Sequence, residues 1–227
     1  MSDRFLVAVD GPAGAGKGTV CREAARQFGL AYLDTGALYR AVGLHALQQD
    51  QWDPEALAQW AAQMDFTFRD LGAEVGFHAF LDGVDVHEQL RREESGVAAS
   101  KVASMLPVRA ALLDFQRAYG APGAAILDGR DVGTVVLPDA QVKIFLTASL
   151  DARAKRRTLE LQEKGESVSF TQIRDQMAQR DERDAKRSHA PMVVAAGATV
   201  VDTSELTLPQ SVQTVARIIA RQRDAAD

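Results

Sequence analysis

Cysteine is almost absent from this chain, which has one, Cys21, in 227 residues. A single cysteine excludes an intrachain disulfide framework, and the four scattered histidines form no zinc-binding pattern. Long apolar runs are missing as well. The run over residues 5–9 ends at Asp10 and is too short for a signal peptide or a membrane span. We therefore expect a soluble cytoplasmic protein.

The chain also lacks an excess of positive charge. Its net charge is −5 and its pI is about 5.4, which argues against a general nucleic-acid binder. Apolar residues make up 46% and charged residues 25%, enough for a packed core and against disorder. The length suits a single domain over residues 1–227, with room for a small insertion.

Short apolar runs alternate with longer helical patterns along the chain. Strands are expected over residues 5–10, 31–34, 124–127, 142–147 and 199–202, and helices over 17–28, 36–49, 54–64, 96–105, 108–119, 151–164, 170–187 and 209–223. Strands separated by helices of ordinary length predict an α/β fold, a parallel sheet with helices on both faces.

The pattern changes over residues 62–105. Residues 66–69 and 74–81 alternate apolar with polar side chains, and Asp82-Gly83 is a strong hairpin signal before residues 84–86. We expect a small inserted antiparallel β/α subdomain here.

The most specific motif lies between the first expected strand and helix. It consists of Gly11, Pro12, Ala13, Gly14, Ala15, Gly16, Lys17, Gly18 and Thr19. The glycines let backbone N–H groups approach a polyphosphate, and the helix N-terminus adds partial positive charge. Lys17 would bridge the β- and γ-phosphates of ATP. Because Gly18 stands where a hydroxyl residue usually follows the lysine, the Mg²⁺-ligand role falls on Thr19, directly or through water.

The ending Gly-Lys-Gly-Thr over residues 16–19 resembles nucleoside monophosphate kinases. The Asp-Gly-Phe-Pro-Arg stretch of adenylate kinases is absent, and the chain has LDGRDVGT over residues 127–134 and LDTGALYR over residues 33–40. With the small inserted sheet, these motifs are similar to bacterial cytidylate kinases, from about residue 5 to the last helix. The resemblance implies a P-loop kinase that uses ATP and Mg²⁺ to phosphorylate CMP and dCMP, with the insertion binding the acceptor.

The same resemblance implies a set of CMP-binding residues. Arg40, whose planar fork suits a phosphate, is assigned to the CMP phosphate. Thr35 is assigned to the same site, where the family often has serine. A cap of the following helix is an equally good interpretation of Thr35. Ser100 and Arg109 become base-edge contacts through the resemblance alone.

Arg130 and Asp131 follow a predicted strand, at the sheet edge where open α/β folds bind ligands. A simple surface ion pair is the alternative. The resemblance assigns Arg130 to the acceptor phosphate and Asp131 to the cytosine base. Asp10 and Asp128 would organise either the Mg²⁺ waters or the loop, and the sequence leaves both roles open.

A helical lid is expected over residues 151–187, with a hinge at residues 165–167. Arg180, Asp184 and Arg187 share one helix face at spacings of four and three. A solvated helix with an Arg180–Asp184 pair is the alternative. The resemblance places Arg180 and Asp184 near the sugar, and Arg187 near phosphate and base. Arg157, on the preceding helix, is expected on the ATP side.

Catalysis would then consist of positioning and cation placement by Lys17, Arg130, Arg180 and Arg187, since an acceptor phosphate needs no side-chain base. Two alternatives stay open. Another small-molecule kinase, of shikimate or dephospho-coenzyme A, would not need Asp131 to face a base amino group. A non-enzymatic nucleotide switch would need switch segments that the sequence does not show. We expect a monomer that acts on small molecules, without nucleic-acid or membrane partners.

Overall fold

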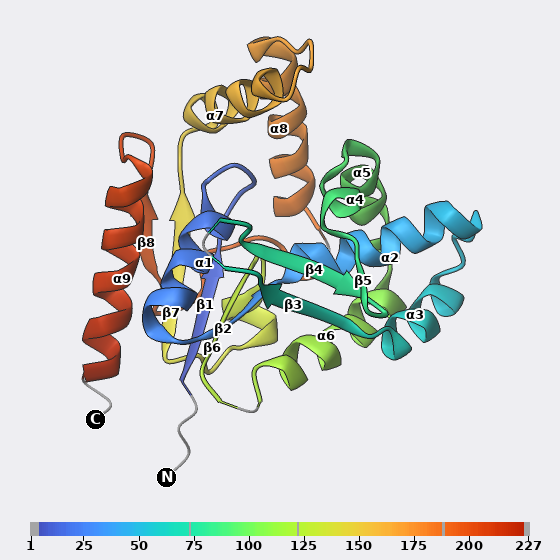
Figure 1. Cartoon of the computed structure of the whole chain (residues 1–227), viewed down its shortest axis with the longest axis horizontal. Helices are drawn as coiled ribbons and strands as arrows, with labels where there is room; N and C mark the ends of the chain where they lie inside the picture. Colours follow the sequence, from blue (N-terminus) through green and yellow to red (C-terminus); the bar gives the residue numbers. More distant parts are fainter. Residues whose placement is uncertain (1–4, 73, 122, 188, 225–227) are drawn as a thin grey trace. The chain divides into compact units, whose positions relative to one another are not determined.

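The computed structural model describes residues 5–72, 74–121, 123–187 and 189–224 (Figure 1). The chain forms two compact units. The first contains the residues up to Ala31 and those from Gly123 onward, and the second is Tyr32–Pro122.

The first unit contains the main sheet, with strands β1 (Leu6–Asp10), β6 (Ala125–Gly129), β7 (Val142–Thr147) and β8 (Thr199–Asp202). The strand order is β2-β6-β1-β7-β8; β2 (Ala31–Asp34) starts in this unit, where the Ala31 N–H donates to the Ala124 carbonyl. β1 is parallel to both β6 and β7, and β7 is parallel to β8, which confirms the predicted parallel sheet. Asp10 lies opposite Gly129 and Phe145, so the carboxyl ends of the three central strands meet at one edge.

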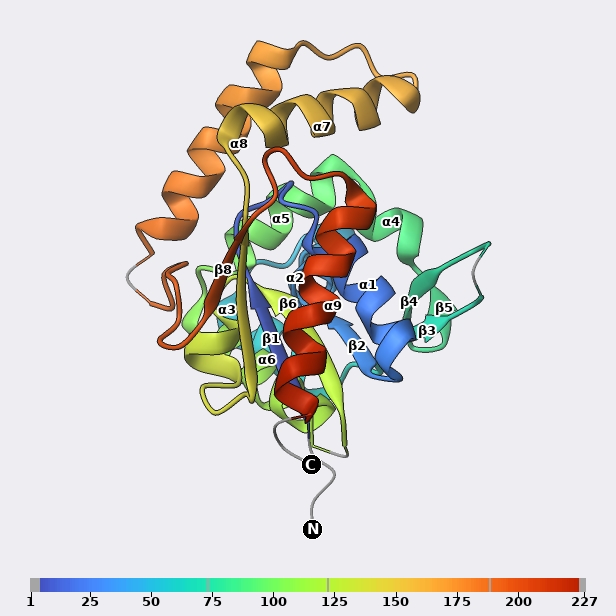
Figure 2. The same ribbon diagram turned by 90° about the vertical axis from the view of Figure 1, so that its left-hand side faces the viewer.

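The helices of this unit are α1 (Lys17–Phe28), α7 (Leu150–Glu163), α8 (Phe170–Ala185) and α9 (Leu208–Asp224), with one π-helical turn, η1 (Val132–Val136). α1 and α9 pack against each other beside the sheet (Figure 2). α7 and α8 form a hairpin with a small core of its own, made of Ala154, Leu161, Ile173 and Met177. The hairpin is therefore held together by its own apolar side chains.

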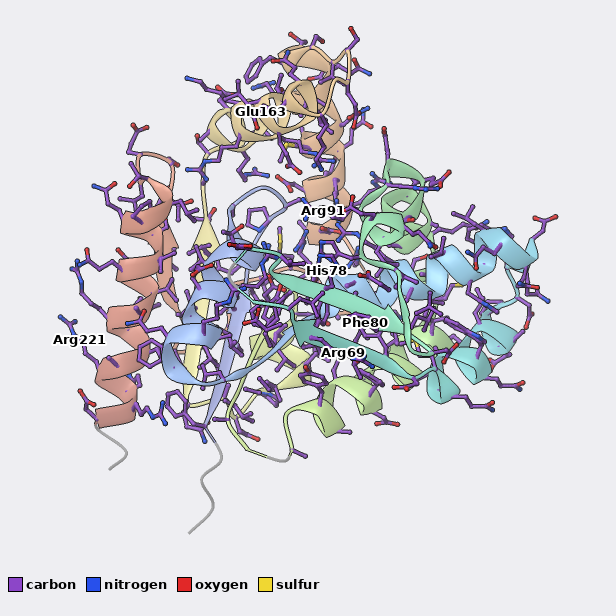
Figure 3. All side chains as sticks on the ribbon, in the orientation of Figure 1. Arg69, His78, Phe80, Arg91, Glu163 and Arg221 are labelled. Atoms are coloured by element: carbon purple, nitrogen blue, oxygen red, sulfur yellow. The ribbon has the colours of Figure 1, made fainter. Side chains whose placement is uncertain are left out.

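The second unit contains α2 (Thr35–Gln49), α3 (Pro54–Gln63), α4 (His87–Arg91), α5 (Glu93–Val102) and α6 (Leu106–Tyr119), with strands β3 (Phe66–Asp70), β4 (Phe77–Leu81) and β5 (Val84–Asp85). β3, β4 and β5 form the predicted antiparallel sheet. Asp82 and Gly83 both have positive φ, 50° and 78°, as their tight hairpin requires. The Arg69 guanidinium lies over the Phe80 ring across β3 and β4, 4.3 Å from its centre (Figure 3).

Some predicted boundaries were wrong. α4 was not predicted, because five residues are too few to show a helical period. α5 starts earlier than expected, with Glu93 and Glu94 in its first turn, where acidic side chains are favoured. α8 ends at Ala185, so Arg187 lies beyond the helix instead of on its face.

In the part of the chain that the structure describes, no single helix is long and apolar enough to cross a membrane. α5 and α6 together have the length and apolar composition of a membrane span, but the pair is bent by 102° at its junction.

Candidate active site

The phosphate loop connects the end of β1 to the start of α1, and its glycines are required by the backbone. Gly11 has φ +145°, and a Cβ there would lie 1.9 Å from the Leu146 carbonyl oxygen of β7. Gly14 and Gly16 have φ +76° and +90°, in the left-handed region that side chains disfavour. The loop is thus held against the sheet in a conformation that turns N–H groups toward a ligand at the α1 N-terminus.

Lys17, the first residue of α1, is buried, and its Nζ donates a hydrogen bond to the Pro12 carbonyl at 2.9 Å. The ammonium group therefore lies over its own loop. Thr19 is half-buried in the first turn of α1, and its Oγ1 accepts a hydrogen bond from Arg22 at 3.3 Å. A hydroxyl oxygen at this place suits a Mg²⁺ ion bound mainly through phosphate oxygens and water.

Asp10 organises the loop after β6. Its two carboxylate oxygens accept the N–H groups of Val132 and Gly133, both at 2.7 Å. Burial raises the pKa of the Asp10 carboxyl, although these bonds act in the opposite direction. A Cβ on Gly133 would lie 3.3 Å from Asp10 Oδ2 and 3.2 Å from the Ala195 Cβ, so glycine permits this close approach.

Asp128 is buried in β6, beside Val9 of β1 in the strand register. Among the described residues, no cluster of three or more histidine, cysteine or acidic side chains is arranged to hold a metal ion. A Mg²⁺ ion at this edge would therefore depend on the nucleotide's phosphates for most of its ligands. Thr19 and the Asp128 carboxylate supply oxygen donors of the kind that Mg²⁺ prefers.

The buried Asp184 of α8 holds two of the predicted arginines. Its Oδ2 accepts from Arg130 Nε at 3.0 Å, and its Oδ1 accepts from Arg187 Nη2 at 2.6 Å. The two alternatives stated from the sequence assigned other partners, Arg130 with Asp131 and Asp184 with Arg180. The structure pairs Asp184 with Arg130, which is 54 residues away in the sequence, and spacing along one helix could not indicate that. Both guanidinium groups keep further N–H donors for a phosphate.

Asp131 is buried at the start of η1, and its backbone carbonyl accepts the Val135 N–H at 2.9 Å. Its charge is one of the smaller causes that raise the pKa of Asp10. Arg180 lies half-buried on α8, one turn before Asp184. The carboxyl edge of the sheet therefore carries Asp131, Arg130 and Arg187 together with the phosphate loop.

Arg157 forms an exposed ion pair with Glu160, Nη1 to Oε2 at 2.9 Å. Burial raises the pKa of Glu160, but the bonds from Arg157 and Lys164 outweigh it and lower the value. The arginine of α7 that contacts the phosphate loop is Arg153, whose Nη1 donates to the Ala13 carbonyl at 3.1 Å. Sequence reasoning missed this residue. The available signal was its place in the first turn after β7, at the carboxyl edge.

The second unit carries the other predicted CMP-binding residues. Asp34, and not Thr35, caps α2, because its side chain accepts the Ala37 N–H at 3.2 Å. Thr35 is the first helical residue and is buried, so the capping interpretation of Thr35 was wrong. Arg40, one turn further on, has Nη1 3.8 Å from Asp34 Oδ2.

Ser100 lies on α5 and Arg109 lies on α6. The Ser100 hydroxyl donates to the Gly96 carbonyl at 3.2 Å, and Arg109 Nη1 donates to the Ala103 carbonyl at 3.4 Å. α2 and α5 approach so closely at Gly43 that a Cβ there would lie 2.8 Å from the Ala98 Cβ. This contact keeps the helices that carry Arg40 and Ser100 side by side within the unit.

Comparison with known proteins covers nearly the whole chain. The family model described as "Cytidylate kinase" matches residues 7–221. The chain is 60% identical over 220 residues to a cytidylate kinase of Magnetococcus marinus, covering 97% of each chain, and 44% identical over 210 residues to one of Proteus mirabilis, covering 92% of each. A solved structure of an uncharacterized protein from Eubacterium ventriosum is similar with a TM-score of 0.51 and 12% identity, over 98% of this chain and 99% of that one. At that identity the structural likeness bears on the fold alone.

Proposed function

This chain belongs to the cytidylate kinase family, and from that premise we propose that residues at the carboxyl edge of its parallel sheet carry the transfer of the γ-phosphoryl group of ATP to CMP. The observation that carries this proposal is the phosphate loop, where Gly11, Gly14 and Gly16 cannot be replaced without strain and Lys17 covers the loop. We extend the acceptors to dCMP, which presents the same phosphate and base.

On the donor side, the proposal assigns the loop residues 11–19 to the triphosphate. Lys17 exchanges its bond to the Pro12 carbonyl for the β- and γ-phosphates. Thr19 would hold a Mg²⁺ ion together with the phosphates, and that ion would supply charge neutralisation. Arg157 joins the ATP side by leaving its exposed partner Glu160, a small loss because surface pairs contribute little.

On the acceptor side, the proposal assigns Thr35, Arg40, Ser100, Arg109, Arg130, Asp131, Arg180, Asp184 and Arg187 to CMP. Arg130 and Arg187 bind its phosphate, because Asp184 already holds their guanidinium groups in place. Asp131 accepts from the cytosine amino group, and Arg109 donates to N3 and O2. Arg40 binds the phosphate, and Arg180 and Asp184 bind the sugar.

The chemical step needs no general base. The CMP phosphate is an anionic nucleophile, and the transition state spreads charge over the transferring oxygens. Lys17, Arg130, Arg180 and Arg187 stabilise that charge best if they are fixed before the reaction. The Asp184 bridge fixes two of these four cations.

The test is steady-state ADP release with ATP and each nucleoside monophosphate in turn. We expect rapid release with CMP and dCMP, slower release with UMP, and a low rate with AMP, GMP or no acceptor. Equal rates with and without CMP would contradict the assignment, and would point to a nucleotide switch or another kinase. The cytoplasmic location and the monomeric state stay predictions.

A further inference from the structure

Arg153 is a buried arginine in the first turn of α7, with 5% of its surface exposed. Its guanidinium donates to three oxygens from three segments. Nε donates to the Ala148 carbonyl at 2.9 Å, Nη1 donates to the Ala13 carbonyl at 3.1 Å, and Nη2 lies 2.7 Å from Asp181 Oδ2. A planar group with five donors can make all three contacts at once, whereas an ammonium group at the same place cannot match the geometry.

These three contacts tie the phosphate loop to α8. Ala13 belongs to the loop, and Asp181 lies on α8, three residues before Asp184. α8 is thus attached at two neighbouring points, to the loop through Arg153 and to the end of β6 through Arg130.

Close packing supports the same connection. A Cβ on Gly14 would lie 2.7 Å from Met177 Cε and 3.2 Å from the Arg153 Cβ, so the loop lies directly against α7 and α8.

Arg153 and Asp181 form a charged bridge in which each side chain compensates the charge of the other. Arg153 is buried, so its positive charge needs a partner. Asp181 Oδ1 is buried and accepts no hydrogen bond within the described part of the chain, which leaves Arg153 as the bonded partner of this carboxylate. Removing either side chain would leave the other charge uncompensated and allow both the loop and α8 to shift.

We propose that Arg153 is a positioning residue for phosphoryl transfer, which fixes the Ala13 peptide of the phosphate loop and α8 in one arrangement through Asp181. It acts without touching the acceptor: the loop cradles the triphosphate, and α8 presents Asp184 with its two arginines. This inference rests on the proposed function of the phosphate loop and goes beyond it, because neither residue of the bridge is among the assigned substrate contacts.

The experiment compares Arg153→Lys and Asp181→Asn with two controls on the exposed side of the same hairpin, Arg174→Lys and Asp175→Asn. Steady-state kinetics are measured with ATP and CMP varied separately, and each variant's fold is checked by circular dichroism and thermal unfolding. We expect a rise in KM for ATP and a fall in kcat, each about tenfold or more, because a charge-assisted hydrogen bond is lost. KM for CMP should change by less than about threefold, because Arg130 still attaches α8 to the end of β6 through Asp184.

The double variant decides whether the two side chains act as one unit. Arg153→Lys with Asp181→Asn should be no slower than the slower single variant, since the same bridge is broken once. Additive losses, or wild-type kinetics in the folded single variants, would overturn the proposal. If Arg153→Lys does not fold, the Asp181→Asn variant decides alone. Asparagine has nearly the shape of aspartate, and Arg153 keeps its hydrogen bond to the Ala13 carbonyl in that variant. A wild-type protein without CMP-dependent activity would instead contradict the proposed function.

Discussion

Two arginines around one buried aspartate show how single residues prepare this site. Arg130 and Arg187 bind the two oxygens of Asp184, whose side chain is nearly inaccessible. A buried carboxylate between two guanidinium groups compensates part of their charge and restricts their rotamers. If these arginines bind the acceptor phosphate as proposed, fixing them in advance reduces the reorganisation that binding requires.

Lys17 gives the most direct prediction at this scale. Lys17→Ala should leave the protein folded, because the lost hydrogen bond goes to the phosphate-loop carbonyl of Pro12 and not to the hydrophobic core. Turnover should fall by roughly several hundredfold or more, since a cation lost at a developing charge costs about 3–4 kcal/mol. The measurement is kcat for ADP release, with Lys164→Ala, an exposed lysine of the α7–α8 hairpin, as the control. A folded variant with near-normal kcat would end the phosphoryl-transfer assignment.

Base choice is predicted to depend on Asp131. An ionised carboxylate only accepts hydrogen bonds, so it favours the cytosine amino group and repels the uracil carbonyl. Asp131→Ala should narrow the CMP:UMP ratio of kcat/KM by about tenfold or more, as expected for about 1–3 kcal/mol per base contact. Measuring both substrates in both proteins tests this. An unchanged ratio would show that Asp131 does not contact the base.

At the scale of elements, the phosphate loop packs against the α7–α8 hairpin at Gly14. Gly14→Ala should raise KM for ATP about tenfold or more, because the new methyl group displaces Met177 and Arg153 in addition to straining the backbone. Gly197→Ala is the matched control, since Gly197 has nearly the same φ, +75°, and nothing within 4 Å of its Cβ position. Similar KM values in the two variants would show that the packing contact has no effect on nucleotide binding.

Asp10 links β1 to η1, and its stabilising effect should depend on pH. Burial raises the pKa of Asp10 in the folded protein. Its contribution to the free energy of unfolding is therefore fully present below the usual aspartate pKa, and it is lost as pH rises through the raised pKa of the folded state. The difference in unfolding free energy between wild type and Asp10→Asn should therefore shrink from about pH 4 upward. Urea unfolding across this range measures it. A difference that grows with pH would mean that the two N–H bonds outweigh burial.

At the scale of the whole molecule, the residues proposed to bind CMP come from both parts of the chain. Arg40→Ala changes the second unit and Arg130→Ala the first. Each should raise KM for CMP about tenfold or more and leave KM for ATP within about twofold, because each removes a charge-assisted bond to the acceptor phosphate. Arg92→Ala, an exposed arginine paired with Glu94, is the control. If Arg40→Ala behaves like this control, the acceptor phosphate is bound without Arg40.

Local chemistry explains most of what could be predicted about the fold. α1 has the predicted bounds because Gly16 and Gly29, both left-handed, limit it on either side. α3 begins where Asp53 and Pro54 indicated, and the Asp82-Gly83 turn connects β4 and β5. The α2 cap was misassigned because Asp34 and Thr35 are adjacent and both can accept from a helix N–H.

The sequence by itself determined the parallel sheet, the small antiparallel sheet and the phosphate loop, because the strand and helix patterns, the hairpin turn and the loop motif that predict them each lie within a few positions of the chain. Only the tertiary structure decided the partners of the charged side chains: Asp10 with the N–H groups of residues 132 and 133, Asp184 with Arg130, and Arg153 with Ala13 and Asp181. Those pairs join segments far apart in the chain. A charged side chain is compatible with many partners until folding buries it, and the cost of burying it unpaired then selects one.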